Sequence, residues 1–221
     1  MGSDNLFHKR KARNRQSLER RVARRAPYKK ILIVCEGEKT EPHYFKGARD
    51  YYSLNTVNVE VRGDCASDPM SIVKFAKQRY REEKDAGDPF DQIYCVFDKD
   101  GHTTYAEAIE ALKSAIPSPT YFTINSVPSF EYWLLLHFIY STRPYDALPG
   151  NSSANQVLTE LKNYLPEYHK SQQTIFIDLI SQLQQAKHYA ELALKESSRN
   201  QTDNPSTRVH QLIATLQSLK D

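Results

Sequence analysis

The chain has 221 residues, of which 39% are hydrophobic, so it can bury a core in one domain with an added piece or in two small domains. Its apolar runs are far shorter than the roughly 18 residues that cross a bilayer, which predicts a cytoplasmic protein that makes no membrane contact. The three cysteines are isolated in the sequence, and this is more typical of buried structural thiols than of a disulfide framework.

The charge is concentrated near the N-terminus. Residues 1–30 carry eleven Lys and Arg against Asp4 and Glu19, a net charge of +9, whereas the whole chain is +3 and its remainder is therefore −6. We predict that residues 1–27 form a basic arm that is mobile in isolation, because it has few apolar residues to bury. The arm is either a solvated tail or a contact for nucleic-acid phosphates. In the second case the contacting residues are Arg13, Arg15, Arg20, Arg21, Arg24 and Arg25.

Strand and helix patterns alternate between residues 31 and 125. Apolar or alternating runs predict strands over residues 31–34, 56–62, 91–98 and 120–125. Amphipathic runs between them predict helices over 40–52, 67–86 and 103–116. This order is typical of an α/β fold with a mostly parallel, four-stranded open sheet and helices on both faces.

The rhythm changes after residue 125. An apolar helix is expected over 128–140, and a polar connection follows it. Three further helices are expected at about 154–164, 172–197 and 205–220, the last with Pro205 near its first position. We therefore predict an α/β domain over 28–140 and a helical extension over 141–221 that packs on it.

Acidic residues follow two of the predicted strands. Glu36 comes after the first strand, and Asp98 and Asp100 come at the end of the third. Doubly wound sheets bind ligands outside the carboxyl ends of their strands, so neighbouring strands would bring these three carboxylates together. Their repulsion is tolerable if Mg²⁺ or Mn²⁺ lies among them. The Asp-Lys-Asp-Gly sequence alone is also typical of a tight turn, so the prediction depends on both motifs.

Five further polar residues each allow two interpretations. Glu131 is either a metal ligand or an acid favoured in the first turn of a helix. Lys39 is either a cation that stabilises phosphate charge or a surface lysine, and Glu41 either assists the site or is a surface acid. His102 either donates to a phosphate or lies in solvent. Asp68 is either a helix cap or a ligand for a second metal.

The segments ILIVCEGEKTEPHYF, YCVFDKDGH and SVPSFEYWLLLHF together resemble the RloB family of bacterial phage-defence (abortive-infection) proteins, and NPSTRVHQLIATL resembles its closing helix. That family is similar to the Toprim group found in topoisomerases, primases and OLD-type nucleases. The resemblance implies a Toprim-like fold in which Glu36, Asp98 and Asp100 form an acidic Mg²⁺ site, with Glu36 as acid/base or ligand. It also implies a partner ATPase encoded in the same operon.

These observations favour a metal-dependent nuclease that cleaves nucleic-acid phosphodiesters in anti-phage defence. Its catalytic residues would be Glu36 and Lys39, and its metal ligands Glu36, Asp98, Asp100 and Glu131. The substrate is left open between DNA and RNA, with tRNA among the candidates, and so is a homo-oligomeric state. The main alternative is a non-catalytic nucleic-acid-binding or effector subunit of an ATPase-linked complex. A phosphatase or nucleotide-processing enzyme is a third interpretation, although it has little use for a basic arm.

Overall fold

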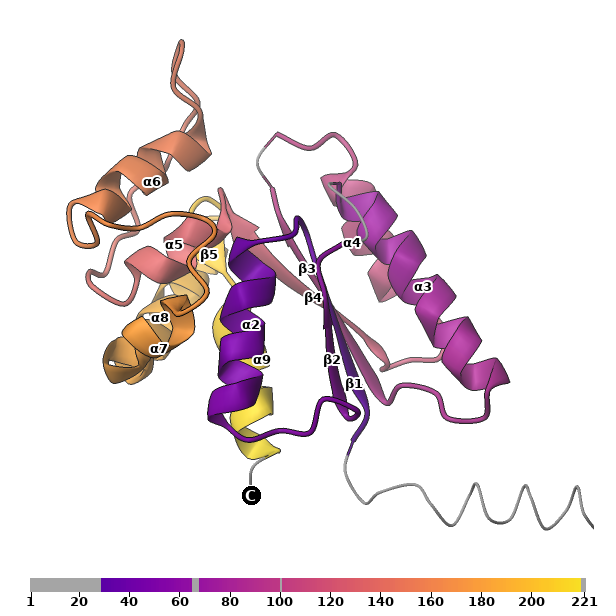
Figure 1. Ribbon diagram of the computed structural model, residues 1–221. Helices are drawn as coiled ribbons and strands as arrows, with labels where there is room; N and C mark the ends of the chain where they lie inside the picture. Colours follow the sequence, from indigo (N-terminus) through magenta and orange to yellow (C-terminus); the bar gives the residue numbers. More distant parts are fainter. Residues whose placement is uncertain (1–28, 65–67, 100, 220–221) are drawn as a thin grey trace, which may run out of the picture.

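The computed structural model describes residues 29–64, 68–99 and 101–219 (Figure 1). The predicted basic arm with its six candidate arginines, and Asp100, lie outside the described residues. The elements in chain order are β1 (Ile31–Cys35), α2 (Thr40–Tyr51), β2 (Val59–Arg62), α3 (Pro69–Asp85), β3 (Gln92–Asp98), α4 (Tyr105–Lys113), β4 (Tyr121–Val127), α5 (Phe130–Leu135), α6 (Ser153–Lys162), α7 (Ile175–Asp178), the 3₁₀ helix η1 (Ile180–Gln182), α8 (Leu183–Arg199), β5 (Ser206–Thr207) and α9 (Val209–Ser218).

The chain folds around one mostly parallel sheet with the strand order β2-β1-β3-β4-β5. The first four strands are parallel to their neighbours, as the sequence predicts. The expected number of four strands is too low, because β5 adds a fifth strand that runs antiparallel to β4. This strand is only two residues long, and a 2.9 Å hydrogen bond between the Ser126 and Thr207 hydroxyls accompanies its pairing. A helix predicted from residue 205 therefore begins only at Val209.

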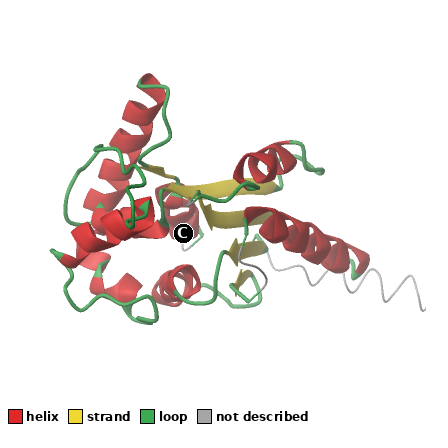
Figure 2. Ribbon diagram, turned by 90° about the horizontal axis from the view of Figure 1, so that it is seen from above, coloured by secondary structure: helices red, strands yellow, loops and turns green. Residues whose placement is uncertain are grey.

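Helices cover both faces of the sheet, as Figure 2 shows from above. Alternate side chains of β1 point to opposite faces, so Leu32 and Val34 join the apolar layer beneath α3 and α4. Ile31, Ile33 and Cys35 join the larger layer beneath α2, α5, α8 and α9. Because both faces are buried, β1 has the continuous apolar sequence typical of a central parallel strand.

Two of the expected helices differ from the observed ones. The apolar segment over 128–140 forms only the short helix α5, and the segment over 172–197 divides into α7, η1 and α8. The apolar residues of the second segment pack against two different parts of the protein. Phe176 of α7 lies 5.1 Å from the Tyr44 ring of α2, whereas α8 turns Ala186, Ala190 and Ala193 into the core.

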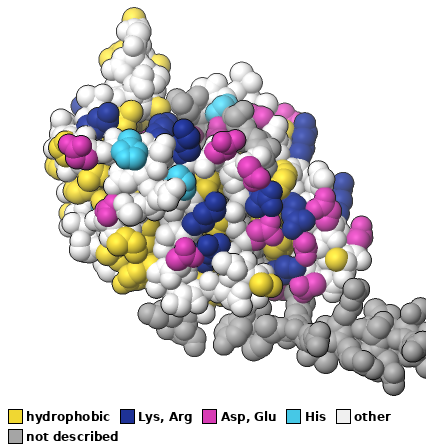
Figure 3. Space-filling model, viewed as in Figure 1, with side chains coloured by type: hydrophobic (Ala, Val, Ile, Leu, Met, Phe, Trp, Pro, Cys, Tyr) yellow, Lys and Arg dark blue, Asp and Glu magenta, His cyan; other side chains and the backbone are white. Residues whose placement is uncertain are grey.

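Charged side chains of both signs are interspersed over β2 and α3, on the face seen in Figure 3. Arg79 pairs there with Glu60 at 3.2 Å and with Glu83 at 3.0 Å, and Arg62 pairs with Asp64 at 2.9 Å. This surface is thus largely neutralised by its own ion pairs. In the described part of the chain, every helix is too short or too polar to span a bilayer.

Candidate functional site

The carboxyl end of β1 leads into a tight loop that carries Glu36. Gly37 has a φ of +72°, which glycine adopts readily, so the chain turns directly after this acid. A Cβ at Gly63, just beyond β2, would lie 2.6 Å from the Gly37 carbonyl oxygen, so only glycine allows the two backbones to approach this closely. The loop packs against the end of β2, and its Glu36 carboxylate accepts a 3.0 Å hydrogen bond from the Asp98 N–H.

Asp98 is the last residue of β3 and connects the end of this strand to α5. Its Oδ2 accepts a 3.0 Å hydrogen bond from the Phe130 N–H in the first turn of α5. Removal from solvent raises the pKa of Asp98 well above its usual range, and Glu41, Glu131 and Glu36 raise it further. The hydrogen bond from Phe130 opposes this shift. Asp98 is therefore crowded by acids at the carboxyl end of the sheet.

Glu41 is a fourth member of this carboxylate cluster, which we define as Glu36, Glu41, Asp98 and Glu131. It lies in the first turn of α2. Removal from solvent raises its pKa to about 8, and the charges of Glu131 and Glu36 add to that effect. The sequence places Glu41 beside the site, but only the fold shows that the charges of Glu131 from α5 and Glu36 from the loop after β1 act on it.

Glu131 is buried, with only 3% of its surface exposed. Its Oε2 accepts a 2.7 Å hydrogen bond from the Ser129 hydroxyl, and its Oε1 accepts a 3.3 Å hydrogen bond from the Tyr168 hydroxyl. Lys170 Nζ lies 3.5 Å from the same Oε1. The Glu131 carboxylate thus has three partners in the protein. This favours a role in positioning neighbouring side chains as much as one in binding a metal ion directly.

Lys170 and Tyr168 are the site residues that sequence reasoning missed. They lie between α6 and α7, in a segment without helix or strand periodicity, so no pattern indicates where it packs. Thr40 fixes this segment, because its hydroxyl donates to the Lys170 carbonyl oxygen at 3.2 Å. The charge of Glu131 raises the pKa of Lys170 most strongly, and Glu41 and Asp98 also raise it. Lys170 therefore supplies a cation whose side chain is 64% exposed at the edge of the acidic cluster.

His102 and Lys39 lie on the same side of the sheet but differ in their contacts. His102 follows the turn after β3, and its Nε2 lies 2.7 Å from Glu36 Oε1. The imidazole therefore contacts a carboxylate and is not free in solvent, and donation to a phosphate stays a prediction. Lys39 is exposed at the N-terminus of α2 and forms no ion pair with any described residue.

Comparison with protein families shows that residues 31–216 match the model of the RloB-like protein family. The chain belongs to the RloB-like family. The match spans every strand of the sheet and all four members of the carboxylate cluster. Searches of curated proteins and of solved structures each found no match.

The carboxylate cluster of this RloB-like protein contains the type of ligand that a hard divalent cation takes. The cluster offers carboxylate oxygens, which are the ligands that suit Mg²⁺ and Mn²⁺. Within residues 29–64, 68–99 and 101–219, no three His, Cys, Asp or Glu side chains are arranged as a metal cage. Mg²⁺ usually takes only one or two protein carboxylates and completes its shell with water and phosphate oxygens. Glu36 and Asp98 would hold the ion, and Asp100 remains a predicted ligand outside the described residues.

Asp68 lies at the N-terminus of α3 as a helix cap. Its carboxylate accepts hydrogen bonds from the Met70 and Ser71 N–H groups, both at 3.1 Å. The Ser71 side chain lowers the pKa of Asp68 most strongly, and the two backbone N–H bonds lower it further. Its partners are therefore those of a cap, and the second-metal interpretation gains no support.

Proposed function

We propose that this RloB-like protein is a metal-dependent nuclease that cleaves nucleic-acid phosphodiesters at the carboxylate cluster of a Toprim-like α/β domain. One observation carries the proposal: removal from solvent raises the pKa values of Asp98 and Glu41, and the charges of the other acids of the carboxylate cluster raise them further. Strongly shifted acids are typical of functional sites. A bound cation would remove the repulsion that raises these pKa values.

The surrounding residues suggest how the chain would handle a phosphodiester. When bound, Mg²⁺ or Mn²⁺ would polarise the phosphate and lower the pKa of a water molecule. Glu36 is held by the Asp98 N–H and by His102, so its carboxylate is oriented to accept a proton. Lys170, and Lys39 on the neighbouring loop, would neutralise negative charge that grows on the phosphate. Glu131 would keep Lys170 at the edge of the cluster.

The biological setting follows from family membership and from the charge of the chain. We propose that the protein acts in the cytoplasm in anti-phage (abortive-infection) defence, together with an ATPase encoded in the same operon. Its substrate would be DNA or RNA, with tRNA among the candidates, and the basic arm would hold the polyanion over a site that otherwise repels it.

A second function is a non-catalytic nucleic-acid-binding or effector subunit of the same complex. The partners of the carboxylates favour it, because Glu131 is engaged by Ser129, Tyr168 and Lys170. An acidic cluster that is fully used by the protein's own side chains would hold the fold together without turning over a substrate.

Cleavage of labelled DNA and RNA by the purified protein, with Mg²⁺, with Mn²⁺ and with EDTA, tests the first proposal. Glu36→Gln keeps the size of the side chain and removes its charge, and loss of such a base or ligand reduces rates by about 10²–10⁴-fold. Glu38→Gln is the matched control, because Glu38 is exposed on the same loop. We expect Glu36→Gln to bind nucleic acid without cutting it and to lose phage protection in cells.

The same experiment separates the two functions. Cleavage that EDTA does not affect would overturn the metal-dependent mechanism. Full phage protection by Glu36→Gln would overturn the nuclease and favour the effector subunit. Glu38→Gln should cut and protect as the parent does, which excludes a general effect of charge on the loop.

A further inference from the structure

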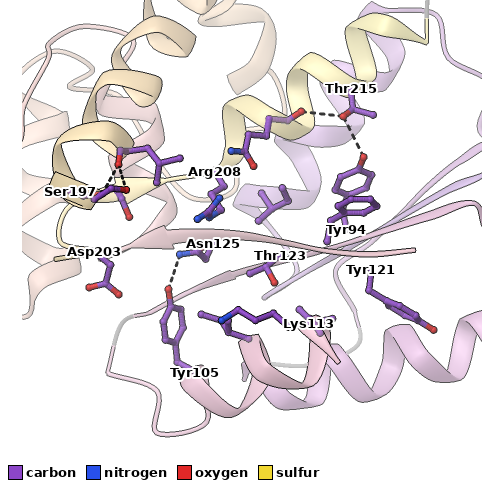
Figure 4. A pocket seen from close by; sticks show the side chains of 18 of the residues that line it. Tyr94, Tyr105, Lys113, Tyr121, Thr123, Asn125, Ser197, Asp203, Arg208 and Thr215 are labelled. Carbon is purple, nitrogen blue, oxygen red and sulfur yellow. Dashed lines mark hydrogen bonds between the residues drawn. The ribbon is translucent and has the colours of Figure 1, made fainter. Parts of the chain in front are cut away.

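A pocket lies at the outer edge of the sheet, away from the carboxylate cluster. It has a volume of about 740 Å³ and is open along β4. Figure 4 shows β4 as its floor, with α4 on one side and α8 and α9 on the other. We call this pocket the β4 groove. Its lining is rich in hydroxyl, amide and aromatic side chains.

The floor of the β4 groove carries unpaired backbone groups. Alternate residues of a strand point their N–H and C=O groups to the same side. The N–H groups of Ile93 and Lys99 donate to the Thr120 and Ser126 carbonyls across the β3–β4 ladder, so Tyr121 and Thr123 turn their backbone groups away from β3. β5 pairs only with Ser126 and Val127, and among the described residues neither Tyr121 nor Thr123 has a backbone partner on the open side.

Each end of the β4 groove offers a polar side chain that lacks a partner. At the Thr120 end, the amide oxygen of Gln92 is shielded from solvent and accepts no hydrogen bond from any described residue. At the Asn125 end, where the Arg208 N–H donates to the Asn125 carbonyl at 3.0 Å, the Arg208 guanidinium lines the groove. No carboxylate among the described residues lies within ion-pairing distance of it.

The other charged residues of the groove are already paired. Asp203 lies 2.8 Å from Lys99, and Lys113 lies 2.6 Å from Glu110. The uncompensated charge of the β4 groove is therefore the cation of Arg208. Exposed strand edges are normally protected by charges or prolines along the edge, and β4, with the sequence YFTINSV, carries neither.

We propose that the β4 groove binds an extended polypeptide segment of a partner protein by strand addition, with a carboxylate of that segment on Arg208. The open edge from Thr120 to Asn125 is about 17 Å long at roughly 3.3 Å per residue, which accommodates five or so residues. Strand addition satisfies the Tyr121 and Thr123 backbone groups at the spacing of a β-ladder. This inference is independent of the proposed nuclease activity.

Features of the chain favour a partner segment over other occupants. The N-terminal residues 1–30 have a net charge of +9, so Arg208 repels them. In a second copy β4 also lies between α4 and α9, so two such recessed edges are poorly shaped to meet strand to strand. Single-stranded nucleic acid would satisfy Arg208, but it lacks the repeated N–H and C=O groups that an open strand edge requires.

Selection of phage-displayed random hexapeptides on the full-length protein tests this inference. We expect enriched sequences to combine β-branched residues with an Asp, a Glu or a free C-terminal carboxylate. For a synthetic copy of the best sequence, fluorescence anisotropy should show that Arg208→Gln weakens binding at least about tenfold, because a hydrogen bond to a charged group is lost. Arg199→Gln is the matched control, since its side chain is 78% exposed and lies outside the groove lining.

Two further measurements decide whether the peptide adds a strand. Bound peptide should slow hydrogen exchange at the Tyr121 and Thr123 amides. Thr123→Pro should abolish binding while the protein still folds, because this N–H faces away from the β3–β4 ladder and proline is tolerated at such edge positions. If Thr123→Pro does not fold, the exchange data and Arg208→Gln still test the site.

Four results would overturn the proposal. The first is that no peptide is enriched relative to a counter-selection on the double variant Arg208→Gln/Thr123→Pro, and the second is that the bound peptide protects other amides. The third is that a dT₁₀ oligonucleotide protects the Tyr121 and Thr123 amides. The fourth is that the protein forms a dimer in sedimentation that Thr123→Pro dissociates. The last two results would assign the groove to nucleic acid and to a second copy, respectively.

Discussion

Asp98 links two parts of the proposed metal site. Its backbone N–H holds Glu36 while its own carboxylate is held by the Phe130 N–H, so two acids are fixed side by side. Removal from solvent and the charges of Glu41 and Glu131 then raise its pKa. Proton binding relieves the repulsion among these acids, so a cation bound at the proposed site would compete with protons for the same oxygens.

This competition gives a prediction for metal binding. Mg²⁺ or Mn²⁺ should raise the melting temperature, and the shift should be larger at pH 8 than at pH 6, because Glu41, with a pKa of about 8, and Asp98 must lose protons. Asp98→Asn combined with Asp100→Asn should abolish the shift in a thermal melt, whereas Asp50→Asn, an exposed acid of α2, should keep it. If the double variant keeps the full shift, the metal binds elsewhere.

His137 gives a second pH dependence, which acts on the stability of the protein without metal. Its side chain is 1% exposed and packs 4.9 Å from the Trp133 ring, and burial lowers its pKa to about 4. In the unfolded chain a histidine titrates near 6.5. The unfolded state therefore binds this proton first, and the stability that neutral His137 provides is present above pH 6.5 and is lost as the pH falls toward 4.

Removal of this imidazole should reduce the loss of stability as the pH falls from 7 to 4. Between pH 7 and pH 4, the melting temperature of His137→Leu, followed by circular dichroism, should fall less than that of the parent. His188→Leu, which changes an exposed histidine of α8, should give a curve parallel to the parent. A parallel curve for His137→Leu as well would show that its burial does not govern this loss of stability.

At the scale of elements, the sequence predicts the strands and helices that have a hydrophobic period. It does not predict the elements that form only through tertiary contacts. The sequence predicts β1 and β3 at nearly their observed bounds, because buried parallel strands are continuous apolar runs. β5 has two residues and no period, so it exists only through its pairing with β4. The same reason explains the site: Glu36 and Asp98 follow strands and could be placed together, whereas Lys170 lies in a segment without a pattern.

The segment between α6 and α7 should therefore matter for activity although it lies outside the α/β core. Lys170→Gln keeps a polar side chain but removes the cation at the cluster, and loss of one such charge-stabilising group reduces rates on the order of 10²-fold. Lys162→Gln, which changes an exposed lysine of α6 in the same helical extension, should leave the cleavage rate unchanged. Equal cleavage rates for the two variants would remove Lys170 from the mechanism.

At the scale of the whole molecule, charge is divided between two parts of the chain. Residues 31–221 carry a net charge of −6 and hold the carboxylate cluster, whereas residues 1–30 carry +9. The face over β2 and α3 pairs its own charges (Figure 3), so its arginines are already neutralised by the body. A polyanion that approaches the acidic site therefore needs a separate source of attraction, and the arm is the part of the chain with that charge.

The salt dependence of binding tests this division. Changing the six arginines at 13, 15, 20, 21, 24 and 25 to Gln keeps the length of the arm and removes its strongest phosphate contacts. Each lost contact should reduce the slope of log K against log salt by about 0.9 for duplex DNA, or about 0.7 for a single strand. The measurement belongs in a Glu36→Gln background, which keeps the nucleic acid intact during titration. The melting temperature should stay the same, because the arm has few apolar residues to contribute to a core. An unchanged slope in the six-fold variant would show that the body, and not the arm, contacts the phosphates.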